Sequence, residues 1–290
     1  MLKIFTNFKT SNDFEFLFSK YSDKPITIFN DYIPQKYSDL QHNPYNFLII
    51  HEPNEFFGMH NWVIQNHNLF SGIFTWSENI LNNCNNALLF DHGARSEGDE
   101  WLNTFENITD KKFEITFLSG AKTLVEGHRF RQEIYKLKDQ IQIPNRWYYV
   151  LDDFNWDDYN KGGIGRSTRP ESATFNNIPK RICYNENMFH VAVENIKSNN
   201  WYTEKIGDAF ASKTLPIYWG CPNIGEHFDE RGIISFETKE ELLNIINNLT
   251  PDDYYSRLEY ININYELVKN SFFPYTLDNL IQQIIDLNNI

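Results

Sequence analysis

The chain has 290 residues, of which 41% are hydrophobic and 16% aromatic, so it is long and apolar enough for two buried cores. Its formal net charge of −13 argues against nucleic acid as a partner, because binding a long polyanion needs a basic face. The three cysteines are far apart and show no CxxC spacing, which argues against a disulfide framework or a zinc knuckle.

The expected location is the cytoplasm. The first residues show no signal-peptide pattern, and the chain contains no apolar run of about 20 residues. The final segment, TLDNLIQQIIDLNNI, has no basic residue that could dock on an anionic membrane. We therefore predict a protein without a membrane span.

Short apolar runs alternate with helical segments in the first part of the chain, which predicts an α/β domain over residues 1–105. The unbroken apolar run NFLII indicates a buried strand, and HEPNEFF follows it directly. The expected strands are Met1–Phe5, Pro25–Phe29, Asn46–Ile50, Gly72–Thr75 and Ala87–Phe90, and the expected helices are Asn12–Tyr21, Phe56–Asn66 and a short one from Ser77.

The alternation continues over residues 106–271 and predicts a second α/β domain. Its segment Asp152–Asn177 has many turn formers and little periodicity, which predicts a long loop. The expected strands are Phe113–Leu118, Trp147–Leu151, Phe189–Val193, Leu215–Trp219 and Gly232–Phe236, and the expected helices are Arg129–Lys138, Trp201–Ser212, Lys239–Leu249, Asp252–Lys269 and Thr276–Leu287.

The pattern from Phe189 to Trp219 is typical of one βαβ unit in a parallel sheet. Such sheets bind ligands at the carboxyl ends of their strands, where helix N-termini favour phosphate oxygens. A carboxylate there can accept both hydroxyls of a ribose, and a lysine can meet a pyrophosphate. Glu194, Asn195, Glu204 and Lys205 occupy this place and suggest a nucleotide, although a solvated helical turn is the commoner explanation for such residues alone.

The longer string in this region is VENIKSNNWYTEKIGDAFASKTLPIYWGCPNI. It resembles the donor-binding signature of the α1,3-fucosyltransferases, glycosyltransferase family 10. The resemblance is strong over residues 187–236, moderate over residues 117–136 and thin before that. It implies the GT-B architecture, with two Rossmann-like domains facing a cleft. It also implies C-terminal helices that return to the first domain, so that residues 272–290 would complete residues 1–105.

The resemblance implies cationic residues for the leaving diphosphate. Arg131, in GHRFRQEIYKLK, would join Lys205 in a cationic notch built by two remote segments, and its guanidinium fork suits phosphate oxygens. Arg166, in YNKGGIGRSTR, lies in a loop that would close over the donor, with a flexible linker as the alternative. This loop lacks the Gly-Lys-Ser/Thr ending of a P-loop.

Further donor-side roles follow from the same resemblance. Glu204 would hold the ribose hydroxyls, and Asn195 would bind the donor through its amide. Trp201 would line the nucleotide pocket where relatives usually carry Tyr, with a buried core tryptophan as the alternative. Glu194 would stabilise the sugar in the transition state or orient the donor.

The general base is expected just beyond the NFLII strand. Glu52 is the first candidate, because a strand-end loop can face a cleft and partial burial would raise its pKa. Glu55 is the fallback, and a structural carboxylate is the alternative for either. A zinc-protease HExxH is excluded because Glu55 replaces the second histidine and Pro53 would break the helix.

The implied reaction transfers fucose from GDP-fucose, with inversion, to a hydroxyl of an acceptor glycan, by analogy in α1,3 linkage to an N-acetylglucosamine-type sugar. We find no Asp-x-Asp, so no metal site and no required cofactor are expected, although Mn²⁺ or Mg²⁺ could stimulate. Oligomeric state stays open. The alternatives are a GT-B transferase with another nucleotide sugar and a non-catalytic nucleotide- or carbohydrate-binding relative.

Overall fold

The computed structural model describes residues 1–6, 15–90, 102, 110–120, 122–151, 163–166, 174–175, 178–179, 183–184, 186–271 and 273–288. The chain divides into two compact units, which we call unit 1 (residues 1–92 and 273–290) and unit 2 (residues 93–272). The sequence places the first boundary at residue 105 instead. Leu102 explains the difference, because its side chain is buried in a core of unit 2.

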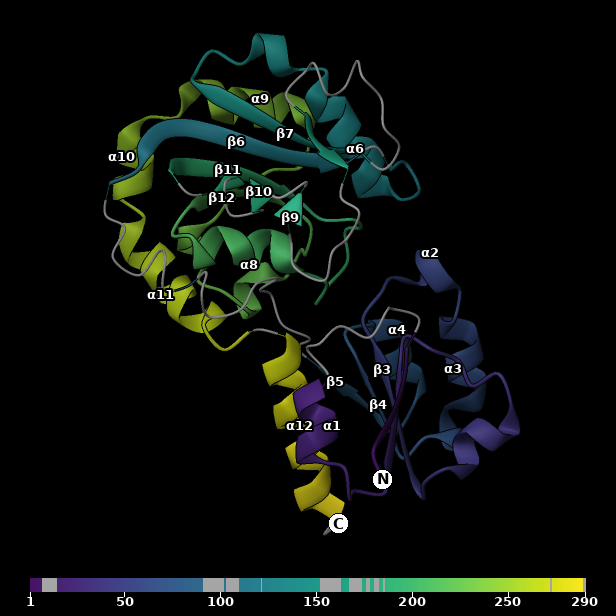
Figure 1. Ribbon diagram of the computed structural model, residues 1–290. Coiled ribbons are helices and arrows are strands. Elements are labelled where there is room, and N and C mark those ends of the chain that lie inside the picture. The colour runs from purple at the N-terminus through teal and green to yellow at the C-terminus, as the bar shows by residue number, and fades with distance from the viewer. Residues whose placement is uncertain are drawn as a thin grey trace. The chain divides into compact units, whose positions relative to one another are not determined.

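Unit 1 contains a five-stranded parallel sheet in which consecutive strands are neighbours (Figure 1). The order therefore never reverses. Its central strands are apolar on both faces, which is why they read as unbroken hydrophobic runs. The strands are β1 (Lys3–Thr6), β2 (Ile26–Asn30), β3 (Tyr45–Ile50), β4 (Gly72–Thr75) and β5 (Ala87–Leu89).

Helices cover both faces of this sheet. On one face, Ile28 and Ile49 pack against α1 (Glu15–Lys20) and the C-terminal helix α12 (Phe273–Asn288). On the other face, Phe29 and Leu48 pack against α3 (His60–Asn66) and α4 (Glu78–Asn83). Figure 1 shows α12 beside α1, so the expected return of the C-terminal helix to the first domain is confirmed.

The helix expected over Phe56–Asn66 is two helices. The first, α2 (Asn54–Phe57), ends at Gly58, whose φ of 65° is left-handed and whose N–H donates to the Asn54 carbonyl. Glycine adopts this conformation without the steric cost of a side chain, so it ends the helix. The second helix, α3, begins at His60, whose N–H donates to the side-chain oxygen of Asn54 at 2.9 Å.

Unit 2 contains a six-stranded parallel sheet in the order β13-β12-β11-β6-β7-β8. The order reverses between β6 and β11, so the chain winds outward in both directions from this pair. The strands are β6 (Lys112–Gly120), β7 (Asn145–Leu151), β8 (Gly163–Arg166), β11 (Asn187–Val193), β12 (Leu215–Trp219) and β13 (Ile234–Ser235), with a separate antiparallel pair of β9 (Thr174–Phe175) and β10 (Ile178–Pro179).

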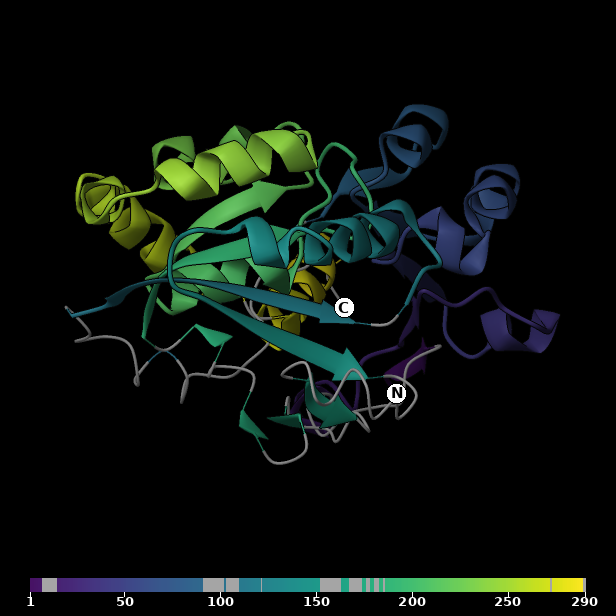
Figure 2. The same ribbon diagram turned by 90° about the horizontal axis from the view of Figure 1, so that it is seen from above.

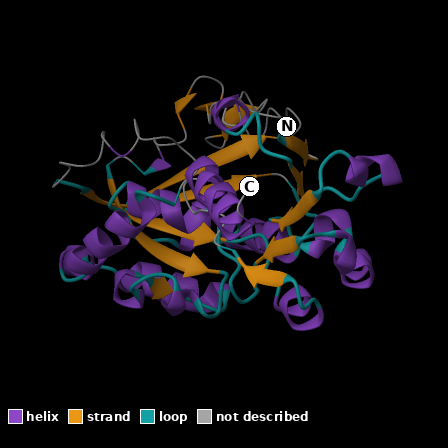
Figure 3. Cartoon of the chain, turned by 90° about the horizontal axis from the view of Figure 1, so that it is seen from below, coloured by secondary structure: helices purple, strands orange, loops and turns teal. Residues whose placement is uncertain are grey.

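Helices again cover both faces (Figures 1 and 2). One face of β11 packs against α6 (Glu126–Tyr135) and α9 (Lys239–Asn248), together with α10 (Pro251–Tyr255). The opposite face packs against α8 (Glu204–Ala211) and α11 (Leu258–Val268). Figure 3 shows the strands in orange between helices in purple. The 3₁₀ turns are η2 (Tyr37–Gln41), η3 (His67–Leu69), η4 (Lys138–Gln140), η6 (Ile224–Glu226) and η7 (Glu230–Gly232).

The prediction of a long loop over Asp152–Asn177 was wrong in part, because β8 and β9 lie within this segment. The strand β8 pairs in parallel with β7 at the edge of the sheet. Its sequence, GIGR, has neither alternation nor β-branched enrichment, so only the pairing with β7 reveals it.

All three cysteines are buried thiols, as the lack of a disulfide pattern predicts. Within the described ranges, no helix combines the length and the apolar character needed to cross a bilayer.

Candidate functional site

The reversal of strand order places a candidate site in unit 2. In an open parallel sheet, ligands bind outside the carboxyl ends of the strands where the order reverses. Here the two strands are β6 and β11. The segment after β6 leads into α6, and the segment after β11 leads into α8. Residues at the start of both helices can therefore meet at one strand end.

Gly127 brings the start of α6 against the end of β11. Its N–H donates to the Asn195 carbonyl at 2.8 Å. A Cβ atom at this position would lie 1.7 Å from the Glu194 carbonyl oxygen. Only glycine permits so close an approach of the two backbones. The contact fixes where the side chains of the first turns of α6 lie.

Arg131, about one turn into α6, forms hydrogen bonds with residues at the end of β11. Its Nη1 donates to the Val193 carbonyl, and its Nη2 donates to Asn195 Oδ1 at 2.9 Å. Burial lowers the pKa of Arg131 to about 10, while the carboxylates of Glu194 and Glu204 oppose this shift. The guanidinium is therefore a fixed positive charge at neutral pH. Asn195, predicted to bind the donor, holds this guanidinium.

Glu194 is fully buried and organises the start of α8. Its Oε1 accepts the Thr203 N–H at 2.8 Å, and its Oε2 accepts the Thr203 hydroxyl at 2.7 Å. The ammonium of Lys205 lies 3.4 Å from Glu194 Oε2 and donates to Thr203 Oγ1 at 2.8 Å. The sequence predicts that Glu194 stabilises the sugar or orients the donor, and in the structure no part of its side chain is exposed. The Glu194 carboxylate holds Thr203 and the ammonium group of Lys205 in position.

Glu204, the neighbouring carboxylate, is placed differently. Its side chain is 36% exposed, and its Oε1 lies 3.5 Å from Lys205 Nζ. The expected helix from Trp201 begins only at Glu204, because the Thr203 side chain caps it by accepting the Lys205 N–H. Glu204 and Lys205 are therefore the first residues of α8, next to its positive dipole end.

Positively charged side chains gather around His128, in the first turn of α6, although the whole chain is acidic. Burial, together with these positive charges, lowers the pKa of His128 to about 4. These charges belong to Arg131, Lys122, Lys205 and Arg129. We name Arg131, Lys205, Arg129 and Lys122 the cationic cluster, and such a cluster suits a diphosphate.

The loop between β11 and α8 is held by a pair of amides. The Asn200 N–H donates to Asn223 Oδ1 at 2.8 Å, and Asn223 Nδ2 donates to Asn200 Oδ1 at 2.9 Å. Asn200 has a left-handed φ of 59°, which asparagine tolerates. Trp201 in this loop is only 2% exposed, which matches a core tryptophan more closely than a pocket wall.

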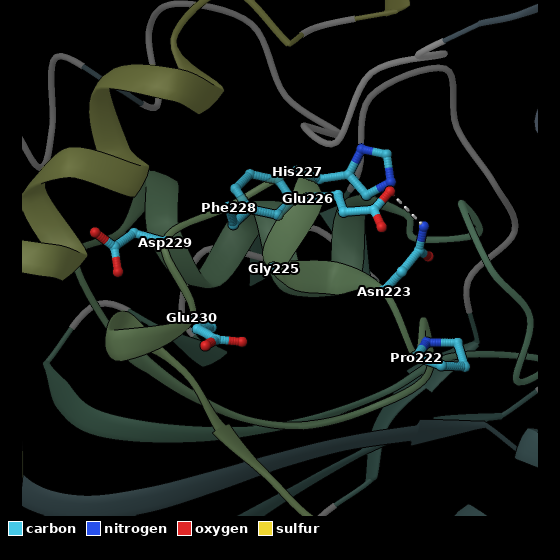
Figure 4. A pocket seen from close by; sticks show the side chains of 8 residues that line it. All are labelled: Pro222, Asn223, Gly225, Glu226, His227, Phe228, Asp229 and Glu230. Atoms are coloured by element: carbon cyan, nitrogen blue, oxygen red, sulfur yellow. Dashed lines mark hydrogen bonds between the residues drawn. The ribbon is translucent and has the colours of Figure 1, made fainter.

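A hollow of about 640 Å³ lies beside the loop that follows β12 (Figure 4). Three carboxyl side chains line it, and Asn223 donates to one of them, Glu226. Its acidic lining makes it a poor place for a diphosphate. The lining residues are Pro222, Asn223, Gly225, Glu226, His227, Phe228, Asp229 and Glu230.

The predicted base lies in unit 1. Glu52 is half-buried and is the second residue after β3, at the carboxyl edge of that sheet, whereas Glu55 is exposed in the first turn of α2. Arg166 is the last residue of β8, and its side chain lies outside the described part of the chain, as do the acidic pairs Asp152-Asp153 and Asp157-Asp158.

Sequence reasoning missed three residues of the site: Gly127, His128 and Thr203. A glycine just inside a helix start, between a strand and two arginines, is the signal that could have identified Gly127. Thr203 stands where a helix cap is expected before Glu204. Across the described residues, no group of three or more His, Cys, Asp or Glu side chains could hold a metal ion.

No protein-family model matches the chain. A candidate fucosyltransferase of Acanthamoeba polyphaga mimivirus is 33% identical over 112 residues, which are 36% of this chain and 18% of that protein. An α-(1,3)-fucosyltransferase of Helicobacter pylori is 29% identical over 110 residues, which are 37% of this chain and 22% of that protein. The matches thus span about a fifth of each relative.

Solved structures share the fold over most of the chain. An α1,3-fucosyltransferase has a TM-score of 0.57 at 16% identity, covering 98% of this chain and 89% of that one. An α1,3-fucosyltransferase with GDP-fucose has a TM-score of 0.51 at 16% identity, covering 89% and 80%. The pneumococcal O-GlcNAc transferase GtfA, with UDP and GlcNAc, has a TM-score of 0.56 at 10% identity, covering 91% and 57%.

The chain has the GT-B fold, and over 36–37% of its length its sequence is similar to fucosyltransferases.

Proposed function

We propose that this protein is a glycosyltransferase that moves fucose from GDP-fucose to a hydroxyl group of an acceptor glycan, with inversion and in α1,3 linkage. One observation carries the proposal: Arg131 and Lys205, 74 residues apart in the chain, both bind residues at the end of β11. Fixed cations at this place suit a leaving diphosphate, whose charge grows as the glycosidic bond breaks. Partial likeness to fucosyltransferases supports fucose as the sugar.

The two glutamates of the donor segment have separate roles in this proposal. Glu204 is exposed enough to accept the two ribose hydroxyls of the nucleotide. Glu194 is buried, so it acts as a positioning residue that holds Thr203 and Lys205 in place. Asn195 likewise acts through Arg131, because its amide oxygen accepts from the guanidinium.

The proposed reaction is one displacement. Glu52 takes the proton of the acceptor hydroxyl, and the oxygen forms a bond to the anomeric carbon of fucose. The bond from that carbon to the phosphate oxygen breaks, and GDP leaves with the electron pair. Arg131 and Lys205 stabilise the charge that develops on GDP. The acceptor, by analogy, carries an N-acetylglucosamine-type sugar.

The identity of the nucleotide sugar needs a direct test, because transferases that share this fold use different donors. The solved relatives include one with GDP-fucose and one with UDP, at TM-scores of 0.51 and 0.56. Thermal shift with GDP, GDP-fucose, GDP-mannose, UDP-galactose and UDP-N-acetylglucosamine separates the possibilities. A ligand at 100 times its Kd adds about 2.7 kcal/mol of stability. We expect GDP and GDP-fucose to raise Tm, and a rise with UDP-sugars alone contradicts the proposal.

Turnover is tested by GDP release from GDP-fucose in the presence of N-acetyllactosamine and related acceptors. We expect release that depends on the acceptor, with a product whose new linkage is identified by NMR. Binding of GDP-fucose without acceptor-dependent release over a broad acceptor panel would instead leave a non-catalytic nucleotide-sugar-binding protein.

A further inference from the structure

Asp31 is the buried acid of unit 1 that the reaction does not use. It follows β2 directly, and its side chain is fully buried. Its backbone has a left-handed φ of 46°, a conformation that few residues with a side chain adopt. Such a conformation persists only where the surroundings hold it, and it concentrates near functional sites. The contacts of Asp31 show what the conformation achieves.

The carboxyl group of Asp31 binds the turn that carries Glu52. Its Oδ1 accepts the N–H of His51 at 2.8 Å and the N–H of Glu52 at 3.1 Å. The Asp31 N–H donates to the Ile49 carbonyl at 2.9 Å, so Asp31 also continues the ladder between β2 and β3. Asp31 therefore binds the end of β3 through its main chain and fixes His51 and Glu52 through its side chain.

Trp76 holds the same turn from the next strand end. Its indole Nε1 donates to the His51 carbonyl at 2.8 Å, and the indole is almost fully buried. The His51 carbonyl and the Glu52 N–H belong to one peptide unit. Asp31 fixes one end of this unit and Trp76 the other, so the plane of the peptide bond that leads into Glu52 has little freedom to rotate.

We propose that Asp31 is a positioning residue for the Glu52 base, which it orients by fixing the Glu52 backbone. This inference rests on the proposed function, because it assumes that Glu52 takes the acceptor proton. A base must lie within hydrogen-bond reach of its proton in a defined direction. A misplacement of about 1 Å can cost 10²-fold in rate.

Two substitutions separate the hydrogen-bond acceptor from the backbone conformation. Asp31→Gly removes the carboxyl group but adopts a positive φ without strain, and Asp31→Asn keeps an acceptor oxygen in a residue that tolerates this φ. Burial, with a smaller contribution from the charge of Glu52, raises the pKa of Asp31 to about 8, although the N–H groups of Glu52 and His51 oppose this shift. Asparagine is therefore a close mimic of the neutral acid. Asn46→Ala serves as a control, because Asn46 lies near the opposite end of β3 and donates to Leu40.

The activity test measures kcat and KM for GDP-fucose. Asp31→Gly should lower kcat about 10- to 100-fold, with KM for GDP-fucose unchanged, since Arg131 and Lys205 belong to unit 2. Asp31→Asn should restore kcat to within a few-fold of wild type, and Asn46→Ala should leave kcat unchanged. An unchanged kcat in a folded Asp31→Gly overturns the proposal, and so does an Asp31→Asn variant as slow as Asp31→Gly.

Amide hydrogen exchange tests the same proposal without turnover. In wild type, the N–H groups of His51 and Glu52 should exchange much more slowly than that of Asn54. Asp31→Gly should abolish this protection, while Asn46→Ala should preserve it. Unprotected His51 and Glu52 amides in wild type would refute the positioning role even if Asp31→Gly does not fold.

Failure of the proposed function looks different. A wild-type protein that neither binds GDP-fucose nor releases GDP disproves the function but leaves the exchange result standing. A fully active Glu52→Gln variant would show that Glu52 is not the base. Asp31 would then not be a positioning residue for the reaction.

Discussion

The carboxyl edges of the two sheets carry different functional groups. In unit 1, the residues that follow β2 and β3 are the acids Asp31 and Glu52. In unit 2, the residues around the end of β11 form the cationic cluster, with Arg131 and Lys205 at its centre. In the proposed reaction, Glu52 of unit 1 takes a proton, and the cations of unit 2 stabilise the leaving anion.

The edges also differ in how the fold builds them. The strand order of unit 1 is sequential, and single residues on neighbouring strand ends fix one turn. The strand order of unit 2 reverses at β6 and β11, which brings two helix starts to one strand end. The comparison teaches that similar sheets acquire different chemistry from the residues just beyond their strands.

The largest expected effect comes from Glu52, the proposed base. Glu52→Gln keeps the size of the side chain but removes its capacity to take a proton. We expect kcat to fall by about 10²- to 10⁴-fold, with KM for GDP-fucose unchanged. Steady-state kinetics measures both. Glu55→Gln is the matched comparison three residues later, and a large loss in Glu55→Gln with normal turnover in Glu52→Gln would reverse the assignment.

A smaller effect is expected at Gly127. An alanine there places its Cβ against the Glu194 carbonyl, so α6 must move away from β11. Overpacking of this kind costs about 1–3 kcal/mol, which lowers Tm by several degrees and displaces Arg131. Thermal melts with and without GDP measure both effects. At Gly225, the Cβ would meet the flexible end of Glu230, so Gly225→Ala should change little.

The smallest expected effect is a contrast in pH dependence. Asp31 has a folded pKa of about 8, above its ordinary 3.8, so its proton stabilises unit 1 at low pH and this stability falls as pH rises from about 4 to 8. His128 has a folded pKa of about 4, below its ordinary 6.5, so stability of unit 2 falls as pH decreases from about 6.5 to 4.

Hydrogen exchange of peptides from each unit, followed across pH 4 to 8, measures the two slopes separately. Asp31→Asn should flatten the slope of unit 1, and His128→Gln should flatten that of unit 2. Slopes of the same sign in both units would contradict the opposite environments that the structure gives these two groups.

Much of this arrangement follows from the sequence, and the reasons differ by element. Strands β3, β11 and β12 are buried on both faces, so their apolar runs predict them closely. The start of α6 was misplaced, because its cap is Val125, which gives no capping signal. The start of α8 was placed too early, although Thr203 is a suitable cap.

The site residues divide in the same way. Lys205 and Glu204 could be proposed because they stand in one continuous motif, and Arg131 because it resembles a known segment. Asp31 could not be predicted, since its importance lies in a positive φ and in bonds to residues about 20 positions away. Gly127 is similar, because its value comes from contact with Glu194 across the fold.

The most direct test of the central claim is calorimetric titration of GDP into wild type, Arg131→Gln, Lys205→Gln and Arg231→Gln. Arg231 is the control, because it is an exposed arginine already paired with Asp229. Loss of a charged hydrogen bond costs about 1.5–3 kcal/mol, so Arg131→Gln and Lys205→Gln should each weaken GDP binding at least about tenfold. Arg231→Gln should bind like wild type. Equal GDP affinity in all four proteins would contradict a diphosphate site at the end of β11.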